Sequence, residues 1–168
     1  MTISMFQASV PVCKQLLGGL DGVLAKAEAH CAAKKIEEAA LLTARLYPDM
    51  FPLARQVGTS TLFGRLTPGR LAGVALPDFS APLTSFAECR ARVADSIAFI
   101  DTLIAEQIDG SEDREFTIPA GGRTMTFTGL NYLQHFALPN FHFHTAAAYM
   151  ILRHNGVELG KRDYVGSY

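Results

Sequence analysis

The chain lacks tryptophan, any excess of one charge and any long hydrophobic run. Its 15 basic residues nearly balance its 16 acidic ones and form no patch of the kind that marks a nucleic-acid surface. No apolar stretch approaches the roughly 18 residues that a membrane span needs. The N-terminus, MTISMFQASVPV, has no basic segment before an apolar one, so no signal peptide is predicted. We therefore expect no nucleic acid and no membrane among the partners.

Cysteine is scarce as well, with Cys13, Cys31 and Cys89 forming no CxxC pair. An odd number of cysteines without a secretion signal is typical of a reducing compartment, so a cytoplasmic protein is predicted. Cys13 and Cys89 fall on apolar helical stripes and are expected in a core, whereas Cys31, near a helix end, could be exposed. No histidine is placed by sequence spacing as the base of any cysteine, so a catalytic thiol is not predicted.

Signatures of several enzyme classes are also missing. The chain has no G-x-x-x-x-G-K-[ST] phosphate loop, no G-x-S-x-G nucleophile elbow and no H-E-x-x-H zinc motif. The glycine pair in AGGR lies between two alternating segments, which indicates a turn and not a nucleotide-binding loop. No pair of carboxylates is placed for acid and base catalysis.

What the chain does have is helical periodicity. Apolar residues recur at three- and four-residue steps over long segments, which predicts an all-α fold. The 168 residues, 49% of them hydrophobic, are enough for one domain over 1–168 with a substantial core. The predicted helices cover residues 3–30, 37–46, 50–66, 85–107 and 128–155.

Several residues mark expected helix boundaries. Pro11 should kink the first helix or mark its true start. Asp49 is expected to be the N-cap of the helix over 50–66, with Pro52 tolerated in its first turn. Ser85 and Glu88 form the S-x-x-E capping box of the next helix.

A β-hairpin is predicted before the last helix. Apolar and polar residues alternate in FTIP and TMTF, on either side of Gly121 and Gly122. This pattern is typical of two strands joined by a tight turn, here over residues 115–128. Thr128 is then expected to cap the last helix.

The candidate site lies in the last helix, in the run LPNFHFHTAAAYMILRHNG over 138–156. Asn140 and His144 are four residues apart, so they share a helical face with Ala147 and Ile151. An amide and an imidazole on an apolar face point toward a core and away from water. The sequence therefore predicts a small polar site inside a helix bundle.

Three long runs carry a specific resemblance: LYPDMFPLARQV (46–57), TMTFTGLNYLQHFALPNFHFH (124–144) and AAYMILRHNGVELGKRDY (147–164). Together they resemble an uncharacterised bacterial family of the DinB/YfiT-like superfamily, over nearly the whole chain. The resemblance implies a DinB-like four-helix bundle, typically a homodimer, with a small hairpin before the last helix. Many superfamily members hold nickel or zinc with three histidines, and some transfer low-molecular-weight thiols such as bacillithiol or mycothiol.

The resemblance also places the three metal positions on this chain. The second-helix histidine corresponds to Gln56, and the H-x-x-x-H pair corresponds to Asn140 and His144. One imidazole thus remains where the superfamily has three, and amide oxygens are weak neutral donors beside the three or four strong ligands that zinc needs. We therefore predict a degenerate site that holds a divalent metal (nickel or zinc) at low occupancy at most. Asp49, close to this site, could orient a ligand.

The predicted function is a small-molecule-binding DinB-like protein, with Asp49, Gln56, Asn140 and His144 around the ligand and His144 as a general base. One alternative is a non-catalytic homodimer that has lost the metal; another is a thiol-S-transferase-like enzyme. An open pocket reaching His144 favours an enzyme, whereas a closed bundle with His144 fully hydrogen-bonded favours the non-catalytic homodimer. The other histidines are His30, His135, His142 and His154, all expected at a surface, a cap or a core edge.

Three further side chains are ambiguous. Arg55 either faces a helix neighbour or supplies a positive charge at a pocket mouth. Tyr149 and Arg153 share a stripe that is either a dimer contact or a half-exposed face. Tyr164 is expected to pack the C-terminal tail against the bundle.

Overall fold

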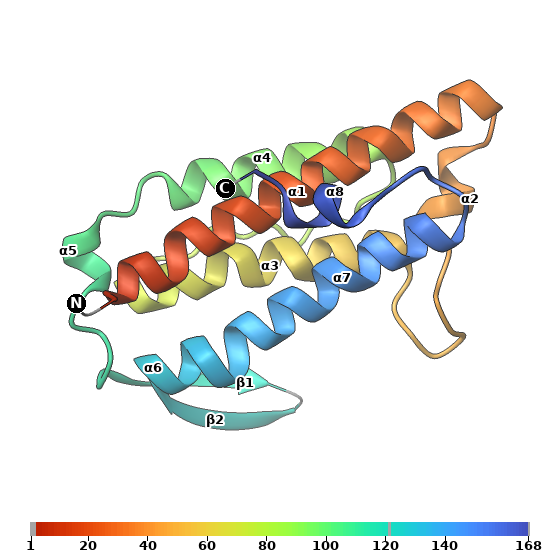
Figure 1. The fold of residues 1–168 in the computed structure, drawn as a ribbon. Coiled ribbons are helices and arrows are strands. Elements are labelled where there is room, and N and C mark those ends of the chain that lie inside the picture. Colours follow the sequence, from red (N-terminus) through yellow and green to blue (C-terminus); the bar gives the residue numbers. More distant parts are fainter. Residues whose placement is uncertain (1–2, 121, 168) are drawn as a thin grey trace.

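Four long helices form the body of the protein in the computed structural model, which describes residues 3–120 and 122–167 (Figure 1). They are α1 (Met5–Lys34), α3 (Leu53–Ala72), α4 (Phe86–Ile100) and α7 (Leu138–His154). The shorter elements are α2 (Glu38–Leu42), α5 (Ala105–Ile108), β1 (Glu115–Ala120), β2 (Arg123–Thr128), α6 (Gly129–Asn131), the π-helical segment η1 (Tyr132–Ala137) and α8 (Lys161–Val165).

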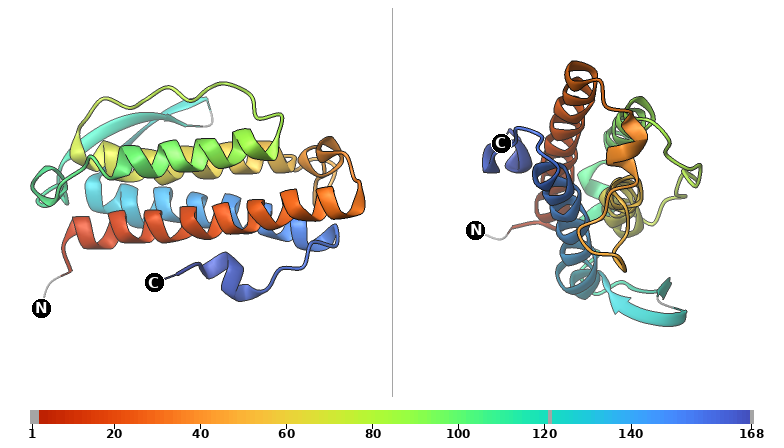
Figure 2. Two further views of the ribbon diagram at one scale, coloured as in Figure 1. Left: turned by 90° about the horizontal axis from the view of Figure 1, so that it is seen from above. Right: turned by 90° about the vertical axis from the view of Figure 1, so that its right-hand side faces the viewer.

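The long helices run in two directions. α1 and α7 point one way, and α3 and α4 point the other way (Figure 1). Because α3 and α4 are parallel, the chain between them, residues 73–85, must return along the length of the bundle before α4 begins (Figure 2). We call residues 73–85 the crossing segment. The helical bundle with one two-stranded hairpin before the last helix confirms the fold class.

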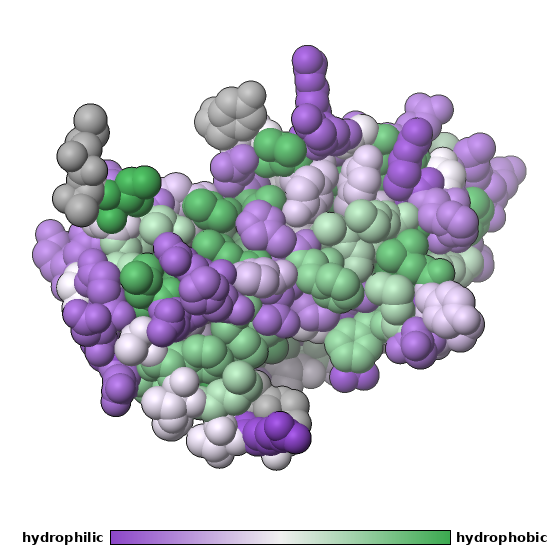
Figure 3. Space-filling model, turned by 60° about the horizontal axis from the view of Figure 1, so that its bottom comes forward, coloured by the Kyte–Doolittle hydropathy of each residue, from purple (hydrophilic) through white to green (hydrophobic). Residues whose placement is uncertain are grey.

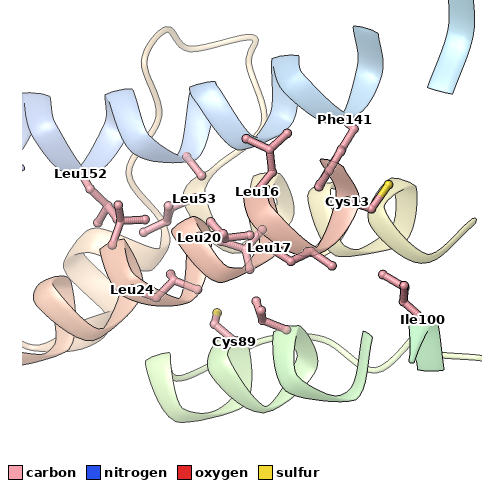
Figure 4. Close-up of a cluster of buried hydrophobic side chains, with 14 of the residues drawn as sticks. Cys13, Leu16, Leu17, Leu20, Leu24, Leu53, Cys89, Ile100, Phe141 and Leu152 are labelled. Atoms are coloured by element: carbon pink, nitrogen blue, oxygen red, sulfur yellow. The ribbon is translucent and has the colours of Figure 1, made fainter. Parts of the chain in front are cut away.

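The core lies where apolar faces of the long helices meet. Side chains of α1 lie between α7 and α4 (Figure 4). Burying each such leucine contributes on the order of 1.5–3 kcal/mol. The labelled core residues of Figure 4 are Cys13, Leu16, Leu17, Leu20, Leu24, Leu53, Cys89, Ile100, Phe141 and Leu152, all buried. Among the described residues, no helix is both long and apolar enough to cross a membrane.

The three cysteines are all buried and free. Cys13 and Cys89 lie in the core, as predicted, and Cys31, whose exposure the sequence left open, is only 3% exposed. Burial raises the pKa of Cys13 and Cys89 to about 12 and also raises the pKa of Cys31. All three are therefore thiols and not thiolates at neutral pH, which removes them as nucleophiles.

The predicted start of the second long helix is wrong. α3 begins at Leu53, so Asp49 lies in the preceding turn and is not its N-cap. The reason is Pro52, whose ring pushes Phe51 out of the helical region and delays the helix. α3 also continues through Pro68 to Ala72 and ends only at Gly73, which adopts a left-handed conformation (φ 68°).

Two other boundaries differ from the prediction. α1 begins at Met5, with Ser4 as its N-cap, and passes through Pro11. α4 is capped by the Ser85 side chain, as predicted, but the Glu88 carboxylate accepts from Thr84 and not from the Ser85 backbone. α4 also ends at Ile100 and not near Gln107. The Gln107 side chain instead accepts a hydrogen bond from the backbone N–H of Ile104 (3.0 Å), which caps the separate helix α5.

The hairpin packs one face on the beginning of the last helix. β1 and β2 pair antiparallel, with Phe116 opposite Phe127. Both rings make edge contacts with Tyr132, at centroid distances of 5.0 and 6.0 Å. Gly121, one of the two predicted turn glycines, lies outside the described residues. The Thr128 side chain accepts a hydrogen bond from Asn131 N (3.4 Å) and so caps the last helix as predicted.

The last helix contains a π-helical stretch immediately before its main part. η1 ends at Ala137, two residues before Pro139. Proline has no N–H for the carbonyl four residues earlier, and its ring crowds that carbonyl, so a wider turn next to it relieves the helix. This wider turn shifts the face that residues before Pro139 present, relative to residues after it.

The C-terminal tail covers part of the Tyr149 stripe. Tyr164 of α8 contacts Tyr149 edge-on (centroids 5.9 Å apart), and its hydroxyl lies 3.3 Å from Nδ1 of His142. α8 also lies against α1 at Gly19, where a Cβ atom would come within 2.6 Å of the Tyr164 carbonyl oxygen. The expected packing of the tail through Tyr164 is confirmed.

Candidate functional site

Gln56 and His144 meet across the contact between α3 and α7. Nδ1 of His144 lies 2.7 Å from Oε1 of Gln56, and Nε2 of Gln56 donates to the carbonyl oxygen of Phe51 (3.3 Å). Because an amide oxygen only accepts, Nδ1 of His144 must carry the proton. The uncharged imidazole therefore has its lone pair on Nε2, and no described residue donates a hydrogen bond to that atom, so it can accept a proton or a hydrogen bond.

Aromatic rings hold the imidazole in place. His144 stacks on Phe51 and on Phe63, with centroid distances of 6.0 and 6.1 Å and nearly parallel planes (11° each). Phe143 contacts it edge-on at 5.2 Å. Burial lowers the pKa of His144 below its usual 6.5. The imidazole is therefore uncharged at neutral pH.

A small pocket opens at this imidazole. Its volume is about 230 Å³, below the roughly 300–1,000 Å³ of typical small-molecule sites. It accordingly suits a compact ligand or one end of a larger one. Its lining residues are Asp49, Met50, Phe51, Gln56, Phe143 and His144.

Three of the four predicted site residues line this pocket, and Asn140 does not. Nδ2 of Asn140 donates to the carbonyl oxygen of Phe136, one turn earlier in the same helix (2.7 Å). Asp49, although it caps no helix, is exposed at the pocket. The structure thus brings Asp49, Gln56 and His144 together.

The donors at this pocket do not fit the three-histidine metal site that the resemblance implies. His144 is the one imidazole, and both polar atoms of the Gln56 amide already take part in hydrogen bonds. Within residues 3–120 and 122–167, no group of three or more histidine, cysteine, aspartate or glutamate side chains is arranged to hold a metal ion. An amide whose oxygen accepts from an imidazole N–H is a poor ligand for zinc or nickel.

Sequence reasoning missed the aromatic walls of the site. Phe63 is seven residues from Gln56 on α3, and therefore on the same face two turns away, a spacing that could have identified it. Phe51 lies outside the helix and reaches His144 only through the turn before α3. Arg55 contacts this wall, since its guanidinium carbon lies 3.7 Å from the centroid of the Phe51 ring.

Comparison with known proteins identifies the family. The family described as "Domain of unknown function (DUF1993)" matches residues 5–165, so the chain belongs to it. The fold is DinB-like: the crystal structure of a DinB family member from Shewanella denitrificans matches with a TM-score of 0.84 and 32% sequence identity. That match covers 97% of this chain and 92% of the other. No curated protein matches the chain.

The lowered pKa of His144 predicts a pH dependence of stability. Below about pH 6.5, His144 binds a proton in the unfolded chain but not yet in the folded protein, where its pKa is lower. Proton binding therefore favours the unfolded state, and the free energy of unfolding decreases as the pH falls from about 6.5 toward the folded pKa. The free energy of unfolding, measured by urea denaturation between about pH 7 and pH 5.5, should fall more steeply for the wild type than for His144→Gln. The matched control, His135→Gln at an exposed position, should keep the wild-type slope. Equal slopes for the wild type and His144→Gln would contradict the lowered pKa that is assigned to His144.

Proposed function

We propose that this DinB-like protein binds a compact, mostly apolar molecule that carries one hydroxyl, thiol or N–H group, and that Nε2 of His144 accepts the hydrogen bond from that group. The observation that carries the proposal is the 2.7 Å contact between His144 Nδ1 and Gln56 Oε1, which leaves Nε2 as the acceptor. The aromatic lining supports an apolar ligand body, since Phe51 and Phe143 border the same pocket.

The same arrangement supports general-base chemistry. A histidine whose Nδ1–H is held by a fixed acceptor is oriented to take a proton at Nε2. A lowered pKa keeps the base unprotonated at neutral pH, although it also makes the base weaker. The buried cysteines cannot supply a nucleophile, so a thiol-transfer reaction, the alternative suggested by the superfamily, would need a thiol on the ligand.

Phenol and toluene test this proposal, because they share one ring and differ in the donor group. In the wild type, phenol should bind about three- to tenfold more tightly than toluene, the range expected for one neutral hydrogen bond. In His144→Phe, which keeps a ring between Phe51 and Phe63, that preference should vanish. Titrations followed by NMR of the His144 region give the affinities.

Toluene serves as the check on the pocket itself. His144→Phe leaves Oε1 of Gln56 without its donor and should be less stable, so retained toluene binding shows that the pocket persists. His135→Phe, an exposed control, should keep the preference for phenol. Equal binding of phenol and toluene by the wild type would overturn the proposal.

We also propose that the site has lost metal binding through its ligands and not through its geometry. Wild-type protein, purified without a tag, should contain well under one zinc or nickel per chain. Gln56→His combined with Asn140→His restores three imidazoles and should bind nickel or zinc, with a melting temperature that rises as metal is added. Metal analysis and thermal unfolding measure both effects.

The control adds His144→Ala to that double variant and should remove most of the gained affinity. A double variant that binds no more metal than the wild type, and that shows no metal-dependent shift in melting, would refute the equivalence of Gln56, Asn140 and His144 to the three metal positions.

We further propose that the protein is a homodimer with one domain per chain. We also propose that it is located in the reducing cytoplasm, which its three free thiols favour. The support for a dimer is an apolar strip on α7, where Phe143 and Met150 are 56% and 51% exposed and lie seven residues, about two turns, apart. Hydrophobic and hydrophilic residues alternate across the face that carries α7 and the hairpin (Figure 3). Phe143 and Met150 are therefore the side chains that we place at the centre of the proposed contact.

Met150→Glu should therefore convert the dimer to a monomer, because it places a charge in the buried contact. The matched control is Met125→Glu on the hairpin, where Met125 is 39% exposed. It should leave the dimer intact. Light scattering at micromolar protein gives the mass, and a monomeric wild type would contradict the proposal.

A further inference from the structure

A second and larger pocket lies between α3, α4 and the crossing segment. Its volume is about 560 Å³, within the range of small-molecule sites. It is lined by side chains from all three segments, among them Arg65 from α3, Arg92 from α4, and Asp78 and Phe79 from the crossing segment. It contains neither Gln56 nor His144.

Arg65 is the unusual residue of this pocket. It is only 4% exposed, and its Nε and Nη1 atoms are buried without a hydrogen-bond partner among the described residues. Its guanidinium carbon lies 4.5 Å from the centroid of the Phe79 ring. A cation–π contact of this kind compensates only part of the desolvation of a charge. A buried guanidinium without partners points to a partner that comes from outside the chain.

The charges around Arg65 are mostly positive. Arg92 donates to the carbonyl oxygens of Phe79 and Ala81, so its charge is not neutralised by these bonds. Arg55 also borders the pocket, and the ion pairs between described residues include none of these three arginines. Asp78 is the one carboxylate among the lining residues.

Asp78 does not neutralise the pocket. It is exposed, and its two oxygens accept hydrogen bonds from the backbone N–H and the hydroxyl of Ser80 (3.0 and 3.1 Å). Burial, and next the charge of Arg92, lower the pKa of Arg65 to about 10, while Asp78 opposes this shift. Arg65 is therefore still charged at neutral pH.

We propose that this pocket binds a small organic anion, whose carboxylate or phosphate group accepts hydrogen bonds from Arg65 and whose apolar part contacts Leu62, Pro82 and Leu83. Guanidinium groups bind both kinds of oxyanion with charge-assisted hydrogen bonds. The apolar lining favours an anion with a hydrocarbon body over an inorganic ion. This proposal does not depend on ligand binding at His144, because His144 and the other residues of its pocket do not line the Arg65 pocket.

Octanoate, octyl phosphate and 1-octanol are the probes, since they share a chain and differ in head group. Isothermal titration of the wild type should show that at least one anion binds, and that octanol binds at least about tenfold more weakly, because hydrogen bonds to charged groups are stronger than neutral ones. The anion that binds with the higher affinity identifies the head group that the pocket prefers. Added salt should weaken anion binding by screening.

Arg65→Met keeps most of the side-chain volume and removes the charge, so it should weaken anion binding by at least about tenfold and leave octanol unchanged. Arg153→Met is the matched control, because Arg153 is exposed on α7 away from this pocket, and it should bind like the wild type. Without any ligand, Arg65→Met should melt no lower than the wild type, since the lost charge is buried and unpaired.

The substitution Asp78→Asn is a second, independent test at an exposed position. It should tighten anion binding several-fold, because it removes the one carboxylate among the lining residues of the pocket. If Arg65→Met does not fold, this variant decides the question. The proposal is overturned if neither anion binds the wild type, if octanol binds as tightly as the anions, or if Asp78→Asn and Arg65→Met leave anion affinity unchanged.

Discussion

Polar side chains buried on α3 must find hydrogen-bond partners inside the bundle, and this requirement fixes how α3 meets its neighbours. α3 packs against α1, α4 and α7, so little of its surface is left to water. Gln56 pairs with His144, and Ser60, one turn further along, pairs with Thr145 (2.6 Å between hydroxyl oxygens). Two such pairs set the register of α3 against α7, because a shift of either helix would leave buried polar groups unsatisfied.

The bond between Gln56 and His144 has a chemical consequence as well as a structural one. In a three-histidine site the metal orients each imidazole, whereas here an amide and two phenylalanine rings do so. The amide accepts from Nδ1 and so leaves the lone pair of the ring on Nε2, which is the arrangement of a hydrogen-bond acceptor or a base. An imidazole can therefore be held in a fixed orientation without a metal ion.

Arg65 breaks the rule that the other buried polar groups of α3 obey. Thr61 and Thr67 donate to carbonyl oxygens of their own helix, but Nε and Nη1 of Arg65 have no such partner among the described residues. The cause lies in topology: α3 and α4 are parallel, so the crossing segment must pass over them (Figure 2). It brings Phe79 onto Arg65 and buries a charge that forms no ion pair with a carboxylate of the described residues. Because buried polar groups in proteins are nearly always hydrogen-bonded, the unpaired atoms of Arg65 call for a specific explanation.

The sequence by itself determined the helical bundle, the hairpin and the caps at Ser85 and Thr128, because periodicity, turns and caps depend on residues a few positions apart. It also placed Gln56 and His144 at one site through a family resemblance. Only the tertiary structure decided which buried groups pair. Helical spacing put Asn140 on the face of His144, yet its amide bonds within its own helix to Phe136. Arg65 reads in the sequence as one scattered basic residue, and its pocket exists only because the crossing segment and α4 pack against α3. Such arrangements depend on how whole segments pack in three dimensions, which local sequence patterns do not encode.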